Sequence, residues 1–285
     1  MSRFAIFVAA VSWPAMEAPS LLVPADAGRL NRRQLFWLAG AAGVGVAAEL
    51  TGCARAAESP VSASPDAPES ISAPVPESIV PPPPARVGTS APLLCRDAWG
   101  ARPPRGPGVP HTLNRMTIHH TEVVLSNNSN SPGRLRQHQR YHQDSQGWID
   151  IAYHIGVDRN GNIYQLRSPE IVGDTATGYD PTGHFLVVCE GDFNEEPVSD
   201  AQLNGAAVAF AWAAQRFAIP TETLAGHRDA SHETTCPGTN LYAYVTSGEL
   251  KRRIDEFVAG GPVDLQLTCG PEAAAIVADI EAGRR

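Results

Sequence analysis

The sequence predicts an α/β fold in which a central mixed β-sheet is flanked by α-helices. From about residue 94 onward, short apolar segments typical of strands alternate with longer segments whose apolar residues show helical spacing. The segment 184–193, "HFLVVCEGDF", is almost continuously apolar, which suits a strand in the middle of a sheet. The 285 residues are 43% hydrophobic and 18% charged, so the chain can bury one large core. We therefore predict one folded domain with appendages.

The first half of this domain is predicted to alternate between strands and a helix. Residues 115–121, "RMTIHHT", form a short strand, and residues 133–146 have the composition of a polar helix. Residues 149–166 contain two strands that are joined by a turn at Asn160 and Gly161. The apolar strand follows after these elements.

The longest predicted helix begins after Ser199, which can cap its N-terminus. Gln202, three positions later, completes a capping box, and the helix stops before Pro220. Another helix is predicted within residues 246–260. The tail, residues 261–285, is expected to add one short helix.

Residues 1–53 are predicted to be an export signal rather than part of the fold. Arg32 and Arg33 precede an apolar run of about fourteen residues, too short to span a bilayer, and this pattern resembles a twin-arginine signal. The following "LTGC" resembles the lipobox of bacterial lipoproteins, which makes Cys53 a candidate lipid anchor. A conventional cleaved signal and an uncleaved membrane helix are the alternatives. We expect an exported protein, held as a lipoprotein at the outer face of the cytoplasmic membrane, or located in the cell wall or secreted.

Residues 54–92 are predicted to form a disordered linker, because they are rich in Pro, Ser and Ala and lack apolar periodicity. The folded domain is expected to cover residues 93–260, followed by the tail 261–285. The net charge of −8 supplies no basic face for phosphate contacts, so we expect no nucleic-acid partner. We also expect a monomer.

Two histidines and a cysteine lie in short motifs that could hold a metal ion. They are His119 in "IHHT", His227 in "GHRD" and Cys236 in "TTCPG". Two imidazoles and one thiolate suit a tetrahedral Zn²⁺ site whose fourth position is open to water, which is the catalytic arrangement. Strand alternation distinguishes the adjacent histidines, because His120 shares a strand face with the apolar Ile118 and packs toward the core. His119 then faces the cleft.

His138 and His142 are four residues apart on one predicted helix, a spacing that is compatible with metal binding. The segment lacks the glutamate of the "HExxH" helix of zinc proteases and has no evident third ligand. We therefore predict a polar helix face there. His232 is predicted to be exposed rather than ligating.

Five motifs lie in order between roughly residues 95 and 245. They are "CRDAWGARPP", "TIHHT", "RYHQDSQGWIDIAYHIGVDRNGNIYQL", "CEGDFNEEPVSDAQL" and "GHRDASHETTCPG". Together they resemble the family of peptidoglycan recognition proteins and type 2 N-acetylmuramoyl-L-alanine amidases. The resemblance implies a single catalytic domain with a zinc ion in a surface groove. It also implies cleavage of the amide bond between N-acetylmuramic acid and L-alanine, so peptidoglycan or muropeptides are the expected partners.

The resemblance assigns roles to individual residues. The metal ligands of the family correspond to His119, His227 and Cys236, in agreement with the strand alternation. The catalytic tyrosine corresponds to Tyr153 in "IAYH", and the position two before the cysteine ligand is Thr234. Zinc lowers the pKa of its bound water to about 7, while both hydroxyls could hydrogen-bond that water or the developing oxyanion.

Glu190 is another candidate general base in this region. The catalytic glutamate of the related anhydro-muropeptide amidases corresponds to Val188 instead, so we assign no catalytic role to Glu190. The sequence also departs from the family at Thr175, where a histidine is frequent. This departure is expected to alter how the substrate is held.

Two rival interpretations belong to other functional classes. A recognition module of the same fold would bind cell-wall fragments without cutting them, but such members generally lose a zinc ligand, commonly the cysteine. A structural zinc domain would need a fourth protein ligand and does not explain Tyr153. Because all three ligand positions are filled, the sequence favours a zinc-dependent N-acetylmuramoyl-L-alanine amidase.

The remaining cysteines are expected to have structural roles. Cys189, in the apolar strand, is predicted to be a buried thiol. Cys95 and Cys269 flank the domain, and a disulfide between them would fasten the tail to the start of the domain in an exported protein.

Overall fold

The structure of the chain is a computed structural model that describes residues 88–285. The predicted export signal 1–53, with the candidate lipid anchor Cys53, lies outside these residues, as does the predicted linker up to residue 87. Within residues 88–285, no helix combines the length and the apolar composition that crossing a membrane requires.

Seven strands form one sheet in the order β6-β2-β5-β3-β4-β1-β7. The strands are β1 (Thr89–Leu94), β2 (Arg115–His120), β3 (Ile155–Val157), β4 (Ile163–Gln165), β5 (His184–Cys189), β6 (Ala225–Gly226) and β7 (Val263–Thr268). Neighbouring strands are parallel except in the hairpin of β3 and β4, so the sheet is mixed, as predicted. β5 is buried along its whole length between β2 and β3, which its apolar run also predicts.

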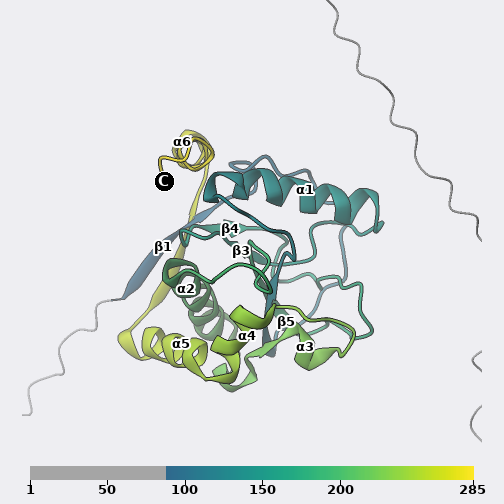
Figure 1. Cartoon of the computed structure of the whole chain (residues 1–285), viewed down its shortest axis with the longest axis vertical. Helices are drawn as coiled ribbons and strands as arrows, with labels where there is room; N and C mark the ends of the chain where they lie inside the picture. The colour runs from purple at the N-terminus through teal and green to yellow at the C-terminus, as the bar shows by residue number, and fades with distance from the viewer. Residues whose placement is uncertain (1–87) are drawn as a thin grey trace, which may run out of the picture. The chain divides into compact units, whose positions relative to one another are not determined.

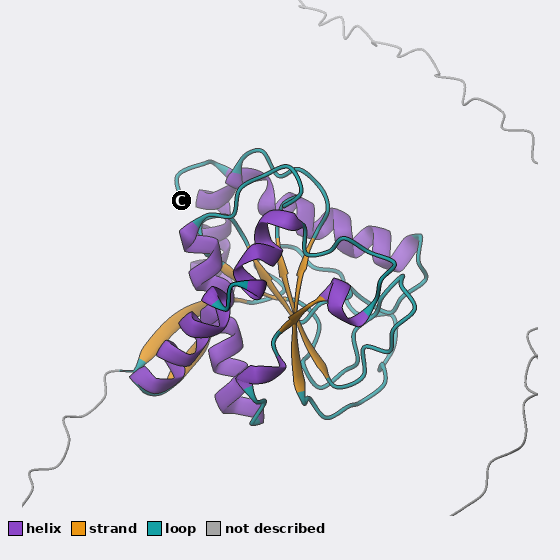
Figure 2. Cartoon of the chain, turned by 60° about the horizontal axis from the view of Figure 1, so that its bottom comes forward, coloured by secondary structure: helices purple, strands orange, loops and turns teal. Residues whose placement is uncertain are grey.

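Helices cover both faces of the sheet (Figures 1 and 2). They are α1 (Ser131–Asp144), α2 (Asp200–Phe217), α3 (His227–Ala230), α4 (Thr239–Thr246), α5 (Glu249–Gly260) and α6 (Gly270–Glu281), with 3-10 helices at Asn128–Asn130 and Thr221–Thr223. Successive residues of β5 serve the two sides of the sheet, as strand alternation requires. Val187 packs in the cluster that contains Phe210 of α2, and Val188 packs in the cluster that contains Leu135 of α1.

The capping box predicted for α2 forms only in part. The hydroxyl of Ser199 accepts a hydrogen bond from the backbone N–H of Gln202 at 3.0 Å, as predicted. The buried Gln202 side chain does not accept the second hydrogen bond of a capping box, from the backbone N–H of Ser199. Its Nε2 donates instead to the carbonyls of Val157 and Glu190, both at 3.0 Å. This glutamine therefore ties α2 to the ends of β3 and β5.

The tail 261–285 contains a strand in addition to the predicted short helix. β7 pairs in parallel with the whole of β1, which places the tail at the edge of the sheet. α6 follows and buries Ile280 in the cluster that contains Leu135 of α1. Because β1 begins at Thr89, the sheet also extends into the segment 54–92, which was predicted to be linker. Long-range pairing of β1 with β7, rather than a local pattern, creates this edge.

Cys95 and Cys269 continue the paired strands β1 and β7 by one residue each. Both are free thiols here, and a hydrogen bond to Cys95 raises the pKa of Cys269 to about 11. The predicted disulfide is thus not formed in this structure, although the two thiols are neighbours. Cys189 is a buried thiol, as predicted.

Replacing Ile280 with alanine should lower the free energy of unfolding by about 2–4 kcal/mol. Ile280 is fully buried (0% exposed), so its truncation leaves a cavity between α6 and α1. Urea denaturation of the full chain measures the change. The exposed Glu272 of the same helix provides the control, since Glu272→Ala should shift stability by no more than about 0.5 kcal/mol. Equal stability of the two variants would show that α6 is not part of the cooperative unit.

Candidate metal centre and groove

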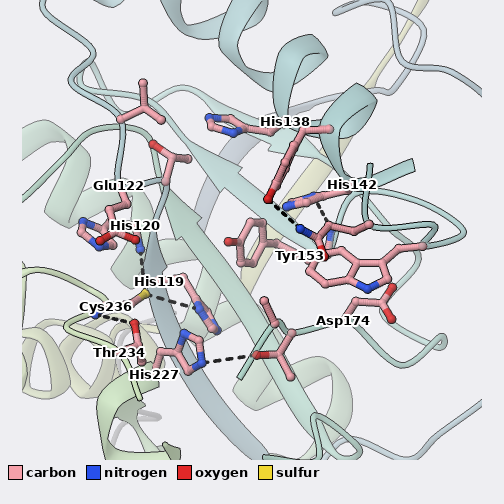
Figure 3. A pocket seen from close by; sticks show the side chains of 18 of the residues that line it. His119, His120, Glu122, His138, His142, Tyr153, Asp174, His227, Thr234 and Cys236 are labelled. Atoms are coloured by element: carbon pink, nitrogen blue, oxygen red, sulfur yellow. Dashed lines mark hydrogen bonds between the residues drawn. The ribbon is translucent and has the colours of Figure 1, made fainter. Parts of the chain in front are cut away.

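His119, His227 and Cys236 converge at one edge of the sheet. β2 and β6 are parallel, with Ile118 opposite Gly226, so the two histidines follow at equivalent positions. The loop after α3 returns Cys236 to the same place. The three potential ligand atoms, one from each residue, lie within 4.8 Å of one another, and all three residues are buried (Figure 3). The structure thus brings together the three residues that the sequence predicts as ligands.

The adjacent histidines of β2 have different surroundings, as strand alternation predicts. The ring centroid of His119 lies 4.7 Å from that of His227 and 5.1 Å from that of Tyr153. His120 is instead hydrogen-bonded, because its Nδ1 accepts from the backbone N–H of Phe193 at 3.2 Å. The backbone N–H of His120 still contributes to the cluster, since it donates to Cys236 Sγ at 3.4 Å.

The residues of the cluster fit a zinc ion. His119 Nε2 is buried without a hydrogen-bond partner among the described residues, and Nδ1 has only Cys236 Sγ beside it, at 3.6 Å. A buried imidazole with so few polar partners is unusual, and a bound cation would satisfy it. Two nitrogens and one sulfur suit Zn²⁺, and three protein ligands are typical of a catalytic rather than a structural site.

Burial determines the protonation of these ligands in the metal-free protein. It lowers the pKa of His119 well below its ordinary value, with a further contribution from His227, and it lowers the pKa of His227 to about 4. Both imidazoles are therefore neutral near pH 7, which is the form that binds metals. Burial also raises the pKa of the Cys236 thiol to about 12. Metal binding must accordingly displace one proton, from this thiol.

Two threonine hydroxyls lie within hydrogen-bonding distance of the His227 ring. Thr177 Oγ1 lies 2.8 Å from His227 Nε2, and Thr175 Oγ1 lies 2.9 Å from Thr177 Oγ1 and 3.4 Å from the same nitrogen. When Nε2 donates its hydrogen to Thr177, Nδ1 carries the lone pair and can bind a metal. Thr175, which stands where the family often has a histidine, therefore helps to position His227. It also forms part of the groove wall.

A groove of about 500 Å³ opens above the cluster, with walls from α1 and from the loops after β2 and before β3. Tyr153 and Thr234, to which the resemblance assigns catalytic roles, both line it (Figure 3). Glu190 lies beneath the groove and is only 1% exposed, which agrees with the absence of a catalytic assignment.

Both groove hydroxyls can donate hydrogen bonds. Burial, followed by the charge of Cys236, raises the pKa of Tyr153 above its ordinary value, so the phenol keeps its proton. Thr234 Oγ1 accepts a hydrogen bond from the backbone N–H of Cys236 at 3.0 Å, which leaves its own hydrogen free. These groups are suited to stabilising negative charge rather than to removing a proton from water.

His138 and His142 belong to no metal-compatible cluster in the described part of the chain, in agreement with the polar helix face predicted for them. Both line the groove from α1 (Figure 3). His142 is buried, its ring centroid lies 4.8 Å from that of Trp148, and burial lowers its pKa to about 3. The four-residue spacing showed that the two side chains share a helix face, but not what that face contacts. His232 is exposed, as predicted.

Glu122 is a groove residue that the sequence analysis missed. It follows β2 with a φ of 56°, a left-handed conformation that is uncommon for a long side chain and is often found at functional sites. It lines the groove, and its charge adds to the effect of burial in raising the pKa of Tyr153 and of Cys236. Asp174, the other carboxylate in the groove lining, is paired with Arg167. Glu122 has no ion-pair partner within residues 88–285.

The fold and the site together define a class of protein, an α/β domain with a buried cluster of two histidines and one cysteine beneath an open groove. The family described as N-acetylmuramoyl-L-alanine amidase matches residues 110–239. Peptidoglycan-recognition protein LB of Drosophila melanogaster is 32% identical over 167 residues, which cover 55% of this chain and 69% of that protein. The chain therefore belongs to the family of peptidoglycan recognition proteins and type 2 N-acetylmuramoyl-L-alanine amidases, as its motifs predict.

Two further comparisons show the range of this family. The N-acetylmuramoyl-L-alanine amidase of Homo sapiens is 33% identical over 155 residues, which cover 52% of this chain and 26% of that protein. The solved structure of peptidoglycan recognition protein LE in complex with tracheal cytotoxin, a monomeric diaminopimelic acid-type peptidoglycan, matches with a TM-score of 0.50 at 28% identity. This match covers 54% of this chain and 92% of that structure. Relatives named for catalysis and relatives named for recognition thus share the fold.

Zinc binding to the metal-free chain should release about one proton near pH 7. With pKa values of about 12 for Cys236 and about 4 for His227, only the thiol has a proton to lose. Zinc affinity should therefore rise about tenfold per pH unit between about pH 6 and pH 8. Titration calorimetry in buffers of different ionisation enthalpy measures the proton count.

Two cysteine variants serve as controls for this measurement. Cys269→Ser removes an exposed thiol outside the groove and should leave the released proton unchanged. Cys236→Ser should bind zinc more weakly and release about one proton fewer than the wild type. Zinc binding by the wild type without proton release would exclude Cys236 as a ligand.

Proposed function

We propose that this protein is a zinc-dependent N-acetylmuramoyl-L-alanine amidase, which hydrolyses the bond between N-acetylmuramic acid and L-alanine in peptidoglycan. The observation that carries the proposal is the complete cluster of His119, His227 and Cys236 in a groove that also contains two hydroxyl donors. Recognition alone does not require three buried ligands at an open groove. The complex of protein LE with a peptidoglycan fragment supports the choice of substrate class.

The cluster would hold the metal ion, and the other groove residues would act on the substrate. A zinc ion bound by His119, His227 and Cys236 would supply a Lewis acid that polarises the scissile carbonyl and promotes the deprotonation of water. As water adds to the carbonyl carbon, negative charge develops on the carbonyl oxygen. The hydroxyls of Tyr153 and Thr234 are the donors in the groove that can stabilise this charge.

Glu122 is the groove carboxylate that can accept the proton of the attacking water. Asp174 is less suited to this role because its charge is already paired with Arg167. As the carbon–nitrogen bond breaks, Glu122 can deliver this proton to the nitrogen of the departing L-alanine. The products are the lactyl carboxylate of the muramic acid and a stem peptide with a free amino group.

The walls of the groove suit a ligand that combines a sugar with a peptide. Tyr141, His142 and Trp148 form an aromatic surface on one side, with ring centroids of successive pairs 5.9 and 4.8 Å apart. Sites for organic ligands commonly combine such surfaces with a few well-placed polar groups. Thr175 and Thr177 supply polar groups to the lining.

The proposed substrate agrees with the predicted destination of the protein, because peptidoglycan lies outside the cytoplasmic membrane. We propose export through the signal predicted in residues 1–53, by the twin-arginine route. Attachment of a lipid at Cys53 stays a prediction, as does the monomeric state.

The purified chain should release free stem peptide from muropeptides, which mass spectrometry detects. Cys236→Ser and chelation of zinc should each lower the rate about a thousandfold or more, because the main source of charge stabilisation is lost. Glu122→Gln should lower kcat about a hundredfold with little change in KM, as expected for a lost general base.

A pair of neighbouring threonines provides the matched control. Thr234→Val should lower kcat, whereas Thr235→Val should not, since Thr235 is exposed and lies outside the groove lining. Muropeptides that bind the wild type but stay intact would identify a recognition module instead. Full activity of Cys236→Ser would exclude the zinc mechanism.

A further inference from the structure

The groove side of α1 carries two basic residues that the proposed mechanism does not use. Arg134 and His138 are one helical turn apart, and both line the groove. The guanidinium of Arg134 has no ion-pair partner within residues 88–285, and it donates one hydrogen bond to the amide oxygen of Gln137 at 2.9 Å. This wall therefore presents a cation that the protein itself leaves unpaired.

A buried carboxylate lies behind His138. Glu190, at the end of β5, is 1% exposed, and neither of its oxygens has a hydrogen-bond partner in the described part of the chain. Its nearest basic group is His138, whose Nε2 lies 3.7 Å from Glu190 Oε2. Because a buried polar group needs a partner, the contact with Glu190 holds the His138 ring with Nε2 turned toward the carboxylate.

This pairing determines what His138 presents to the groove. Nε2 is buried on the side of Glu190, whereas Nδ1 has no hydrogen-bond partner among residues 88–285 and the side chain as a whole is 14% exposed. With Nε2 on the side of Glu190, Nδ1 is the ring nitrogen left for a ligand in the groove. Figure 3 shows the His138 ring projecting from α1 at the pocket. A guanidinium and an imidazole one turn apart are suited to binding one carboxylate.

The other charged groups of the groove do not compete for this role. Glu122 is acidic and would repel an anion, whereas the charge of Asp174 is paired with Arg167, so the α1 wall is the part of the groove that favours a carboxylate. His142, the next histidine on α1, is buried, and its pKa of about 3 keeps it neutral.

We propose that Arg134 and His138 form a subsite for a free carboxylate of the stem peptide, with Glu190 as the positioning residue that holds the His138 ring. The inference rests on the proposed function and specifies its substrate. It makes the enzyme selective for acidic stem peptides over stems in which the same carboxylate is amidated. Two carboxylates of the stem could occupy the subsite, that of the glutamate in second position and that of the diamino acid in third position.

The test compares muropeptides that differ only in amidation at the second or at the third stem position. At one of these two positions, the wild type should cleave the acidic muropeptide with a kcat/KM about tenfold above that of the amidated one. The position at which amidation has this effect identifies the carboxylate that the subsite binds. Arg134→Gln and His138→Gln should each remove most of this preference through KM. Their activity on the amidated substrate should fall much less than their activity on the acidic one.

Glu190→Gln distinguishes positioning from a purely structural role. It should remove the preference for the acidic stem while leaving cleavage of the amidated stem intact, which a disrupted fold would not do. Arg140→Gln is the matched control, because it removes one positive charge from an exposed position of α1 outside the groove and should keep the preference.

Binding measurements separate this inference from the proposed function. Calorimetry with the Cys236→Ser variant compares the affinities for the acidic and amidated stems without any cleavage. If this variant binds the acidic stem preferentially but the wild type cleaves neither stem, the subsite is supported and the amidase is refuted. Equal cleavage and equal binding of acidic and amidated stems would contradict the proposed subsite. An unchanged preference for the acidic stem in Arg134→Gln and His138→Gln would contradict it as well.

Discussion

The parallel pairing of β2 with β6 is the constraint on which the site depends. It places Ile118 opposite Gly226 and so brings His119 and His227 to equivalent positions at one edge of the sheet. Cys236 reaches them from a loop that is tied back by a hydrogen bond from the backbone N–H of Arg228 to the carbonyl of Cys236, at 2.9 Å. A shift of the register by one residue would turn His119 into the opposite layer and disperse the cluster.

Burial then determines the chemistry that this arrangement can support. The same desolvation that keeps His119 and His227 neutral keeps Cys236 and Tyr153 protonated. The metal-free site therefore holds no charge that opposes its burial, and it gains a negative charge only when a cation arrives. In the proposed mechanism, proton transfer is assigned instead to Glu122, an exposed residue of the groove lining, so that metal binding and acid–base chemistry involve different residues.

Sequence reasoning predicted the features that depend on local patterns and missed those that depend on distant partners. The apolar run of β5 and the alternation along β2 identified an interior strand and the outward His119. By contrast, β7 is stabilised by pairing with β1, and His138 of α1 meets Glu190, which follows β5, only through the tertiary fold. Gln202 shows the same limit, since its spacing from Ser199 predicts a local bond while its side chain bonds to two distant carbonyls. The motifs identified the ligands because they reflect family resemblance, which carries long-range information.

The central claim, that His119, His227 and Cys236 hold a metal ion with one position left for the reaction, is tested most directly by zinc-edge X-ray absorption of the zinc-loaded chain. We predict one sulfur at about 2.3 Å, two imidazole nitrogens at about 2.0–2.1 Å and one oxygen that does not come from the protein. Loss of the sulfur signal in Cys236→Ser would assign it. A second sulfur or a third imidazole in the wild type would instead reveal a closed structural site and contradict the catalytic assignment.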